Sequence, residues 1–285
     1  MERSLMEKEK NNTECGPQNG AAAPMVCGLL GEKLGHSLSP RIHREIFRLT
    51  GREGSYDLLE CPPERVEALL EECGGTFAGI NVTIPYKVKV MESLDGLSPE
   101  AEAIGAVNTI LFRDGRKTGW NTDYLGFGKM LERNGIPVEG KVAVVLGAGG
   151  AARAVVQYLK DHGATSVTAV SRSGGSFICP VISYAELAER RGDILVNCTP
   201  VGMSGHPDRS PVPESVVARF AAAVDLIYNP RVTPFLAMAG RLGKKAVDGM
   251  DMLVAQAVAS QEIWQGKRLP ASLVDRIIAE LEERP

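Results

Sequence analysis

One stretch of small residues in this sequence could bind a phosphate-containing ligand through its backbone. Residues 147–152 fit the pattern G-x-G-x-x-A and lie between an apolar segment, 141–146, and a helical one. In such a loop Gly147 permits a tight turn, Gly149 lets the backbone approach a pyrophosphate, and Ala152 allows close helix packing. The N-terminus of the helix adds free N–H groups and a positive dipole end. We therefore predict a nicotinamide dinucleotide site, with a flavin, S-adenosylmethionine or a turn without nucleotide as alternatives; its contacts would be Gly147, Ala148, Gly149, Gly150 and Ala151.

The residues after the next strand indicate which dinucleotide would bind. An NAD-binding fold usually has an Asp or Glu about 20 residues beyond the glycine loop, where the carboxylate binds the ribose 2′-hydroxyl. This sequence has Ser171, Arg172 and Ser173 there. A carboxylate would repel a 2′-phosphate, whereas a guanidinium flanked by hydroxyls can bind one. We expect NADP, unless Arg172 is only a solvated surface charge; residues 174–180 add no second basic side chain, which leaves the strength of the preference open.

Composition limits the function classes. The chain has 285 residues, 44% of them hydrophobic and 24% charged, which is enough for two modest domains. Its net charge of -3 argues against nucleic-acid or anionic-membrane partners, which need a surplus of Lys and Arg. Six cysteines without paired spacing indicate reduced thiols in the cytoplasm, and no set of residues has the spacing of a metal site. No apolar run is long enough to span a membrane, and no signal peptide is evident.

The pattern along the chain predicts an α/β protein. Residues 1–24 are polar and aperiodic, which is typical of a disordered leader. Beyond them, short apolar runs alternate with helical stretches, as in βα units on a mostly parallel sheet. We expect two α/β domains flanking a cleft, an N-terminal one with an open, mostly parallel sheet and a C-terminal Rossmann-like one that binds NADP. The expected strands cover residues 25–30, 55–60, 77–83, 141–147, 166–172, 193–199, 222–228 and 244–249.

Local signals set the boundaries of several elements. Ser39 and Pro40 suit the N-cap and first position of a helix that runs to Thr50 and ends at Gly51. Residues 106–122 read as a hairpin with an Asp-Gly turn. The last two helices follow the second set of strands, so they could pack back on the first domain. The expected domains are residues 25–123, completed by 249–285, and residues 124–248.

Polar clusters fall at the predicted ends of strands, where open α/β sheets bind ligands. They are GHSLSP at 35–40, NVTIPYK at 81–87, and GAVNT with GWNTD within 105–123. Together with GAGGAARA, NCTPVGM, DLIYNP and DGMDMLVAQA, these segments resemble the shikimate dehydrogenase family from about Met25 to the C-terminus. The resemblance implies an NADP-dependent oxidoreductase acting on a CH–OH group. The implied reaction is the reversible reduction of 3-dehydroshikimate to shikimate in the biosynthesis of chorismate and the aromatic amino acids.

The resemblance also implies roles for individual residues. Ser37 and Ser39 match hydroxyls that bind the shikimate carboxylate, and Ser39 could instead act only as a helix cap. Thr83, Asn108 and Gln256 match contacts to the substrate. The remaining matches are Lys87 and Asp123 as the catalytic pair, which also contacts substrate, Tyr228 at the cleft, and Gly249 among the cofactor contacts.

The residue types suit the chemistry. Reducing a ketone by hydride transfer builds negative charge on oxygen, so a proton donor must lie beside that oxygen, and the reverse reaction needs a base there. Lys87 can serve both directions if Asp123 orients its amine. Lys89 is typical of a solvated surface charge, and His36 and His43 are expected in packing without a chemical role. No metal is required.

Two rival functions remain at this stage. A quinate or dual quinate/shikimate dehydrogenase would keep almost all of these motifs, although two serines at 37 and 39 favour shikimate. A catalytically silent relative that binds the metabolite and regulates transcription through a partner is disfavoured by Lys87 and Asp123, and by the lack of a basic patch. The sequence leaves open whether the protein is a monomer or a homodimer.

Overall fold

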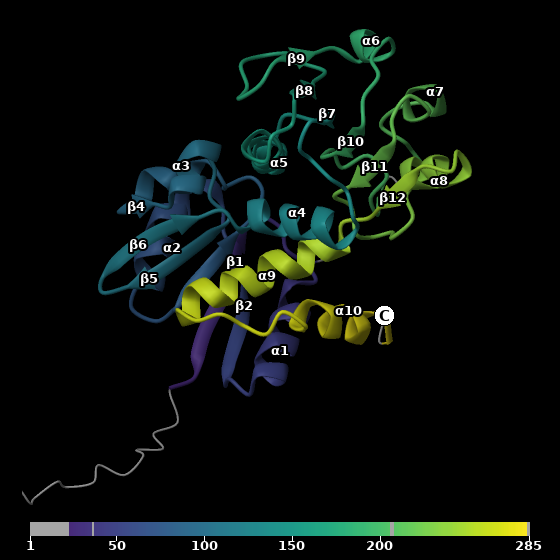
Figure 1. The fold of residues 1–285 in the computed structure, drawn as a ribbon. Coiled ribbons are helices and arrows are strands. Elements are labelled where there is room, and N and C mark those ends of the chain that lie inside the picture. The colour runs from purple at the N-terminus through teal and green to yellow at the C-terminus, as the bar shows by residue number, and fades with distance from the viewer. Residues whose placement is uncertain (1–22, 36, 206–207, 284–285) are drawn as a thin grey trace, which may run out of the picture.

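The computed structural model describes residues 23–35, 37–205 and 208–283. The predicted leader therefore lies outside the described residues except for its last two positions, and so does His36. The described chain folds around two separate six-stranded sheets (Figure 1).

The first sheet is mostly parallel, as predicted. β1 pairs in parallel with β2 and β3, while β3, β5 and β6 pair antiparallel and β4 lies parallel to β6. The strands, in their order across the sheet, are β2 (Gly54–Glu60), β1 (Met25–Gly31), β3 (Gly79–Val82), β5 (Thr109–Arg113), β6 (Arg116–Trp120) and β4 (Gly96–Leu97). The helices of this part are α1 (Ser39–Thr50), α2 (Val66–Cys73) after a 3-10 turn (Pro63–Arg65), a second 3-10 turn (Lys89–Ser93) and α3 (Pro99–Ile104).

The second sheet is parallel throughout. Its strands, in their order across the sheet, are β9 (Val181–Ile182), β8 (Ser166–Val170), β7 (Val142–Leu146), β10 (Ile194–Asn197), β11 (Ala222–Asp225) and β12 (Lys245–Val247). In order of appearance this is 3-2-1-4-5-6, the doubly wound arrangement in which a dinucleotide binds where the strand order reverses. That point lies between β7 and β10. The helices of this part are α5 (Gly150–Asp161), α6 (Tyr184–Leu187), α7 (Glu214–Val217) and α8 (Pro234–Arg241).

Two long helices join the sheets. α4 (Thr122–Arg133) leads out of the first sheet, and α9 (Met250–Gln265) returns to it (Figure 1). They pack backbone to backbone, because a Cβ at Gly126 would lie only 2.7 Å from the carbonyl oxygen of Met252. α9 and α10 (Leu273–Glu283) share an apolar cluster with Ile42 and Ile46 of α1. The last two helices therefore pack against α1, which follows the first strand of the first sheet.

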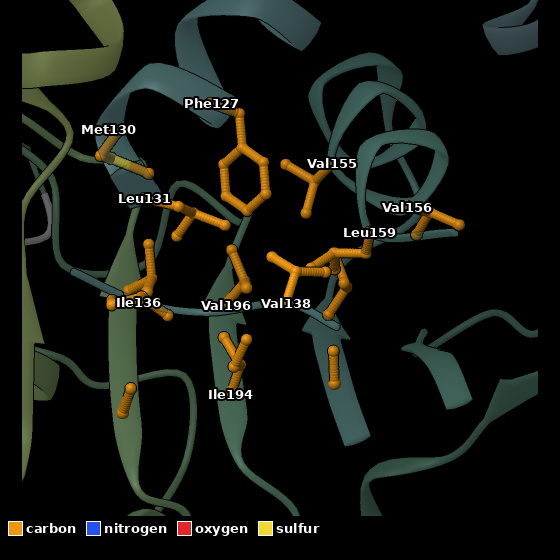
Figure 2. Packing of buried hydrophobic residues seen from close by; sticks show 14 of the residues in the cluster. Phe127, Met130, Leu131, Ile136, Val138, Val155, Val156, Leu159, Ile194 and Val196 are labelled. Carbon is orange, nitrogen blue, oxygen red and sulfur yellow. The ribbon is translucent and has the colours of Figure 1, made fainter. Parts of the chain in front are cut away.

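α4 also takes part in the core of the second sheet. Figure 2 shows Phe127 and Leu131 facing Val155 and Leu159 of α5, above Val196 of β10. All five side chains are buried. Burying one such side chain contributes about 1.5–3 kcal/mol, so α4 is held firmly between the two sheets.

The local predictions have mixed outcomes. The hairpin is confirmed, with Asp114 and Gly115 at φ of 54° and 71° between β5 and β6. Gly51 ends α1 at a φ of 64°. The prediction that Ser39 is the N-cap of α1 is wrong, because the N-cap is Leu38 and Ser39 is the first helical residue. The backbone N–H of Ser39 donates to Ser37 Oγ at 3.2 Å, so the preceding serine supplies the acceptor. β4, α3 and β9 were not predicted.

Candidate functional site

A cleft of about 640 Å³ lies between the two sheets. Its walls come from the first sheet and the loops after its strands, from the first turns of α1, α4 and α5, from α9, and from the loops that follow β10 and β11. The predicted site residues that line it are Ser37, Ser39, Thr83, Lys87, Asn108, Asp123, Ala151, Tyr228, Gly249 and Gln256. The other predicted cofactor residues, Gly147, Ala148, Gly149, Gly150, Ser171, Arg172 and Ser173, lie outside this lining.

The ion pair of Lys87 and Asp123 lies in the wall of the cleft. Lys87 Nζ donates to Asp123 Oδ2 at 2.6 Å, and the two side chains are only 16% and 11% exposed. Asp123 belongs to the first turn of α4, whose N-cap Asn121 accepts a hydrogen bond from the N–H of Tyr124. The other carboxylate oxygen of Asp123 accepts from Asn108 Nδ2 at 2.9 Å. The pair is thus fixed from two sides and can present an oriented amine to a ligand.

Ser37 and Ser39 lie where the loop after β1 enters α1. The N–H of Ser37 donates to the carbonyl of Leu34 at 2.9 Å, which folds the loop over the edge of the cleft. Both side chains are half-buried. Two hydroxyls at the N-terminus of a 12-residue helix form a suitable environment for a carboxylate.

The far wall comes from the second sheet and α9. Burial raises the pKa of the Tyr228 phenol, which keeps it a neutral hydroxyl. Gln256 Nε2 donates to the carbonyl of Leu253 at 2.8 Å, within its own helix. Gly249 is required by a close approach, because a Cβ there would lie 2.2 Å from the carbonyl oxygen of Leu226.

The glycine loop has the geometry of a dinucleotide site. Gly147 has a φ of 107°, and a Cβ there would lie 3.3 Å from the carbonyl oxygen of Cys198, at the end of the neighbouring β10. A Cβ on Gly149 would point into open space, so the backbone is accessible to a ligand. Ala152 is fully buried against the sheet. A Cβ on Gly150 would lie 3.5 Å from Lys87 Cδ, which brings this loop next to the ion pair.

Arg172 lies just beyond β8, which ends at Val170 rather than at residue 172 as expected. Its guanidinium is exposed and forms no ion pair with any residue that the structure describes. Ser171 Oγ accepts the N–H of Ser173 at 3.3 Å, which turns the chain tightly around Arg172. The side chain is therefore free to bind an anion.

Asp225 organises the loops at this end of the second sheet. Its carboxylate accepts from Asn197 Nδ2 at 3.0 Å and from Thr233 Oγ1 at 2.7 Å. Burial raises the pKa of Asp225 to about 6. Met203 and Leu226, in the loops after β10 and β11, line the cleft but were not predicted as site residues. Their motifs, NCTPVGM and DLIYNP, were a signal that could have pointed to them.

His43 is a packing residue, as predicted. It is fully buried, stacks on Tyr56 with ring centroids 3.9 Å apart, and meets Gln261 Nε2 at 3.0 Å. Burial lowers its pKa to about 3. Lys89 is exposed and donates to the carbonyl of Pro63 at 2.6 Å, away from the ion pair.

The described residues contain neither a cluster of metal ligands nor a membrane-spanning helix. No group of three or more His, Cys, Asp or Glu side chains in that part of the chain could hold a metal ion. None of the described helices is both long and apolar enough to cross a membrane.

The fold and the cleft together define a dinucleotide-dependent oxidoreductase with two α/β domains. The family model for the shikimate dehydrogenase substrate binding domain matches residues 29–110. The shikimate dehydrogenase (NADP(+)) of Clostridium perfringens strain SM101 is 46% identical over 267 residues, covering 90% of this chain and 98% of that protein. The chain belongs to the shikimate dehydrogenase family.

Solved structures agree with this assignment. A chorismate mutase/shikimate 5-dehydrogenase fusion protein from Clostridium acetobutylicum superposes with a TM-score of 0.89 at 47% identity, covering 92% of this chain and 99% of that one. Shikimate 5-dehydrogenase from Thermus thermophilus, in complex with NADP(H) and shikimate, has a TM-score of 0.81 at 36% identity, covering 90% and 99%. The fold prediction is confirmed.

Proposed function

We propose that this protein is an NADP-dependent shikimate dehydrogenase that interconverts 3-dehydroshikimate and shikimate, on the route to chorismate and the aromatic amino acids. The observation that carries the proposal is the Lys87–Asp123 pair beside the glycine loop, within one cleft. The names of the relatives at up to 47% identity support the same reaction and the same cofactor.

Lys87 is the proton donor and acceptor in this mechanism. The bound cofactor supplies a hydride to the ketone carbon, so negative charge develops on the ketone oxygen. The Lys87 ammonium gives its proton to that oxygen, and in the oxidation the neutral amine takes the hydroxyl proton back. Asp123 holds the amine in place through the 2.6 Å contact. Burial in the wall of the cleft keeps the side chains of the ion pair from rotating into solvent.

The polar residues of the cleft orient the substrate ring. In this proposal Ser37 and Ser39 bind the carboxylate at the start of α1. Thr83, Asn108 and Asp123 bind ring hydroxyls from the first sheet, while Gln256 and Tyr228 close the far side. A polyol held by many short, directional contacts presents one carbon for hydride transfer.

The second sheet binds the cofactor. The backbone from Gly147 to Ala151 receives the pyrophosphate at the N-terminus of α5, and Gly249 lets the chain after β12 approach closely. Ser171, Arg172 and Ser173 bind the 2′-phosphate, which distinguishes NADP from NAD. This assignment is supported by the guanidinium of Arg172, which is exposed and forms no ion pair with another described residue.

The organisation around the site follows from these roles. We infer that residues 25–123, completed by 249–285, form the catalytic substrate-binding domain, and that residues 124–248 form the NADP-binding domain. We also infer a cytoplasmic enzyme, since all five described cysteines are free thiols. The protein would act as a monomer or homodimer on small molecules, without a nucleic-acid or membrane partner.

Two exposed apolar side chains at the cleft support domain closure. Ile84, from the first domain, is 78% exposed, and Met203, from the second, is 46% exposed, and both line the cleft. Closure over substrate and cofactor would bury them and exclude water. Small-angle scattering with and without both ligands should show a smaller radius of gyration in the complex. An unchanged radius would rule out this closure.

A spectrophotometric assay tests the function. The formation of NADPH, followed by the absorbance of its reduced nicotinamide, should depend on both shikimate and NADP⁺. Quinate in place of shikimate tests the rival dehydrogenase, and NAD⁺ in place of NADP⁺ tests the assignment of Arg172. A higher kcat/KM with quinate would overturn the assignment of shikimate as the substrate. No turnover with any combination of substrate and cofactor would indicate a catalytically silent relative.

A further inference from the structure

Three buried hydroxyls meet beside the catalytic ion pair. Thr109, Thr122 and Ser260, here called the hydroxyl cluster, come from β5, α4 and α9 and are each fully buried. Thr109 Oγ1 lies 3.1 Å from Thr122 Oγ1 and 3.0 Å from Ser260 Oγ, and Thr122 Oγ1 lies 3.1 Å from Ser260 Oγ. The cluster ties α9 to β5, which follows Asn108, and to α4, which carries Asp123. None of its members lines the cleft.

The cluster acts on one carboxamide. Asn108 Oδ1 accepts from Thr109 Oγ1 at 3.0 Å and from Thr122 Oγ1 at 3.2 Å, and the backbone N–H of Thr122 donates to the same oxygen at 2.7 Å. Three donors on the oxygen fix which end of the carboxamide points where. The Nδ2 group then faces Asp123 and donates to Oδ1 at 2.9 Å. The hydrogen bonds of Thr109 therefore reach the ion pair through Asn108.

Asn81 donates to two of the three hydroxyls. Its Nδ2 donates to Thr109 Oγ1 at 3.0 Å and to Ser260 Oγ at 2.9 Å, while its Oδ1 accepts from Tyr56 OH at 2.8 Å. Ser260 Oγ donates its own proton to the carbonyl of Gln256 at 2.9 Å, while Thr109 Oγ1 donates its single proton to Asn108. A fully satisfied buried network of this kind holds its members in one arrangement.

We propose that Thr109 is a positioning residue of the dehydrogenase: its hydroxyl, at the centre of the hydroxyl cluster, holds Asn108 and through it Asp123 in the orientation that turnover requires. The inference rests on the proposed function. Thr109 itself touches neither ligand, so its effect is exerted through the geometry of the residues that do. Turnover falls when the hydrogen bonds that orient the catalytic residues are lost, even when every residue in contact with substrate is still present.

The test compares Thr109→Val, which keeps the shape of the side chain, with Thr109→Ser, which keeps the hydroxyl. We expect Thr109→Val to lower kcat/KM for shikimate about fivefold to tenfold, the scale of one lost hydrogen bond. The KM for NADP⁺ should be unchanged, and Thr109→Ser should restore kcat/KM to within about twofold of the wild type. Wild-type kcat/KM in Thr109→Val, or equal impairment in Thr109→Ser, would overturn the proposal.

A matched control separates positioning from stability. Ser98 is also a buried hydroxyl, 4% exposed, and its oxygen accepts from the N–H of Ala101 as the N-cap of α3 rather than from a residue of the ion pair. Ser98→Ala should lower Tm and leave kcat/KM unchanged. If Thr109→Val does not fold, Thr109→Ala removes the same hydroxyl with a smaller side chain and should lower kcat/KM by a similar factor. Wild-type activity in that variant would overturn the proposal as well.

A crystal structure of Thr109→Val gives a readout that is independent of turnover. We expect the Asn108–Asp123 hydrogen bond to be lost or split between two carboxamide orientations, and to be intact in Thr109→Ser. A wild-type protein without shikimate-dependent NADPH formation would refute the proposed function. An unchanged Asn108 carboxamide in Thr109→Val would refute the positioning role, whatever the outcome for the reaction.

Discussion

The substrate side and the cofactor side of the proposed site are organised by different means. On the first-sheet side, Lys87, Asp123 and Asn108 are held to one another by short hydrogen bonds within a buried wall. On the second-sheet side, the glycine loop presents accessible backbone. Arg172 is exposed there and forms no ion pair with another described residue. The first half is organised before substrate arrives. The second half offers accessible N–H groups and one free charge, which suits a long, flexible cofactor.

The difference predicts where side-chain substitutions matter. Removing a preset side chain should affect the chemical step, because its orientation has no substitute. Removing a free surface charge should weaken binding only, since solvent and salt already screen it. Substitutions at Lys87, Ser37 and Arg172 probe this contrast, and their effects should decrease in that order.

Lys87→Ala should have the largest effect. Losing the proton donor should lower kcat by about 10² or more, the usual scale for a general acid. Steady-state measurement of NADPH formation at saturating substrates gives this value. Lys89→Ala is the matched control, two residues along the chain and exposed, and should retain wild-type kcat. Equal kcat in the two variants would remove Lys87 from the mechanism.

Ser37→Ala should weaken substrate binding more than it slows the chemical step. The hydroxyl is expected to bind the carboxylate, and a hydrogen bond to a charged group contributes about 1.5–3 kcal/mol. The KM for shikimate should therefore rise about tenfold or more, with kcat within about twofold of the wild type. Substrate titration at saturating NADP⁺ measures both. A fall in kcat at unchanged KM would assign Ser37 a different role.

Arg172→Ala should affect only the cofactor, and less strongly. Because the guanidinium is exposed, we expect the KM for NADP⁺ to rise about fivefold, near the upper range for solvent-exposed charge pairs. The KM for NAD⁺, which lacks the 2′-phosphate, is the internal control and should not change. Equal changes for both cofactors would mean that Arg172 does not recognise the phosphate.

Part of the pH dependence of the free energy of unfolding should come from His43 of α1, which stacks on Tyr56 of β2. Its folded pKa of about 3 lies below the ordinary 6.5, so the unfolded chain binds the proton more readily. Stability from this group is complete above pH 6.5 and is lost as pH falls toward 3. Between pH 7 and pH 6 the loss is about 0.7 kcal/mol by linkage.

The comparison that isolates His43 is between variants. Urea unfolding at about pH 7 and about pH 6 should show a smaller loss in His43→Leu than in the wild type. Asp225 responds with the opposite sign, because its raised pKa of about 6 lets the folded chain bind a proton first. Since that contribution is present in both proteins, it cancels in the difference. The same pH dependence in both proteins would exclude His43.

Features that depend only on residues close together in the sequence could be predicted from it. The glycine loop, the Asp114–Gly115 turn and the alternation of strands and helices each depend on local geometry, and the structure has all three. Short elements could not be predicted in the same way. β4 and β9 have two residues each, too few to show a period of alternation.

Contacts between segments that are distant in the sequence could be identified only from the folded structure. Thr109 and Ser260 are 151 residues apart, and nothing in either local sequence marks them as partners. Lys87 and Asp123 were paired through the family resemblance rather than by their spacing of 36 residues. The N-cap of α1 was misassigned by one residue because the helix begins at Ser39 itself, whose backbone N–H donates to Ser37 Oγ. Only the path of the loop before α1 shows where the helix starts.

The most direct test of this account is a crystal structure of the protein with shikimate and NADP⁺ bound. We predict a reacting hydroxyl of shikimate within hydrogen-bond distance of Lys87 Nζ, with Asp123 and Asn108 in the positions described above. The pyrophosphate should lie over the backbone of residues 147–151. Shikimate bound away from Lys87 and Asp123, or a cofactor that does not contact the glycine loop, would contradict the account.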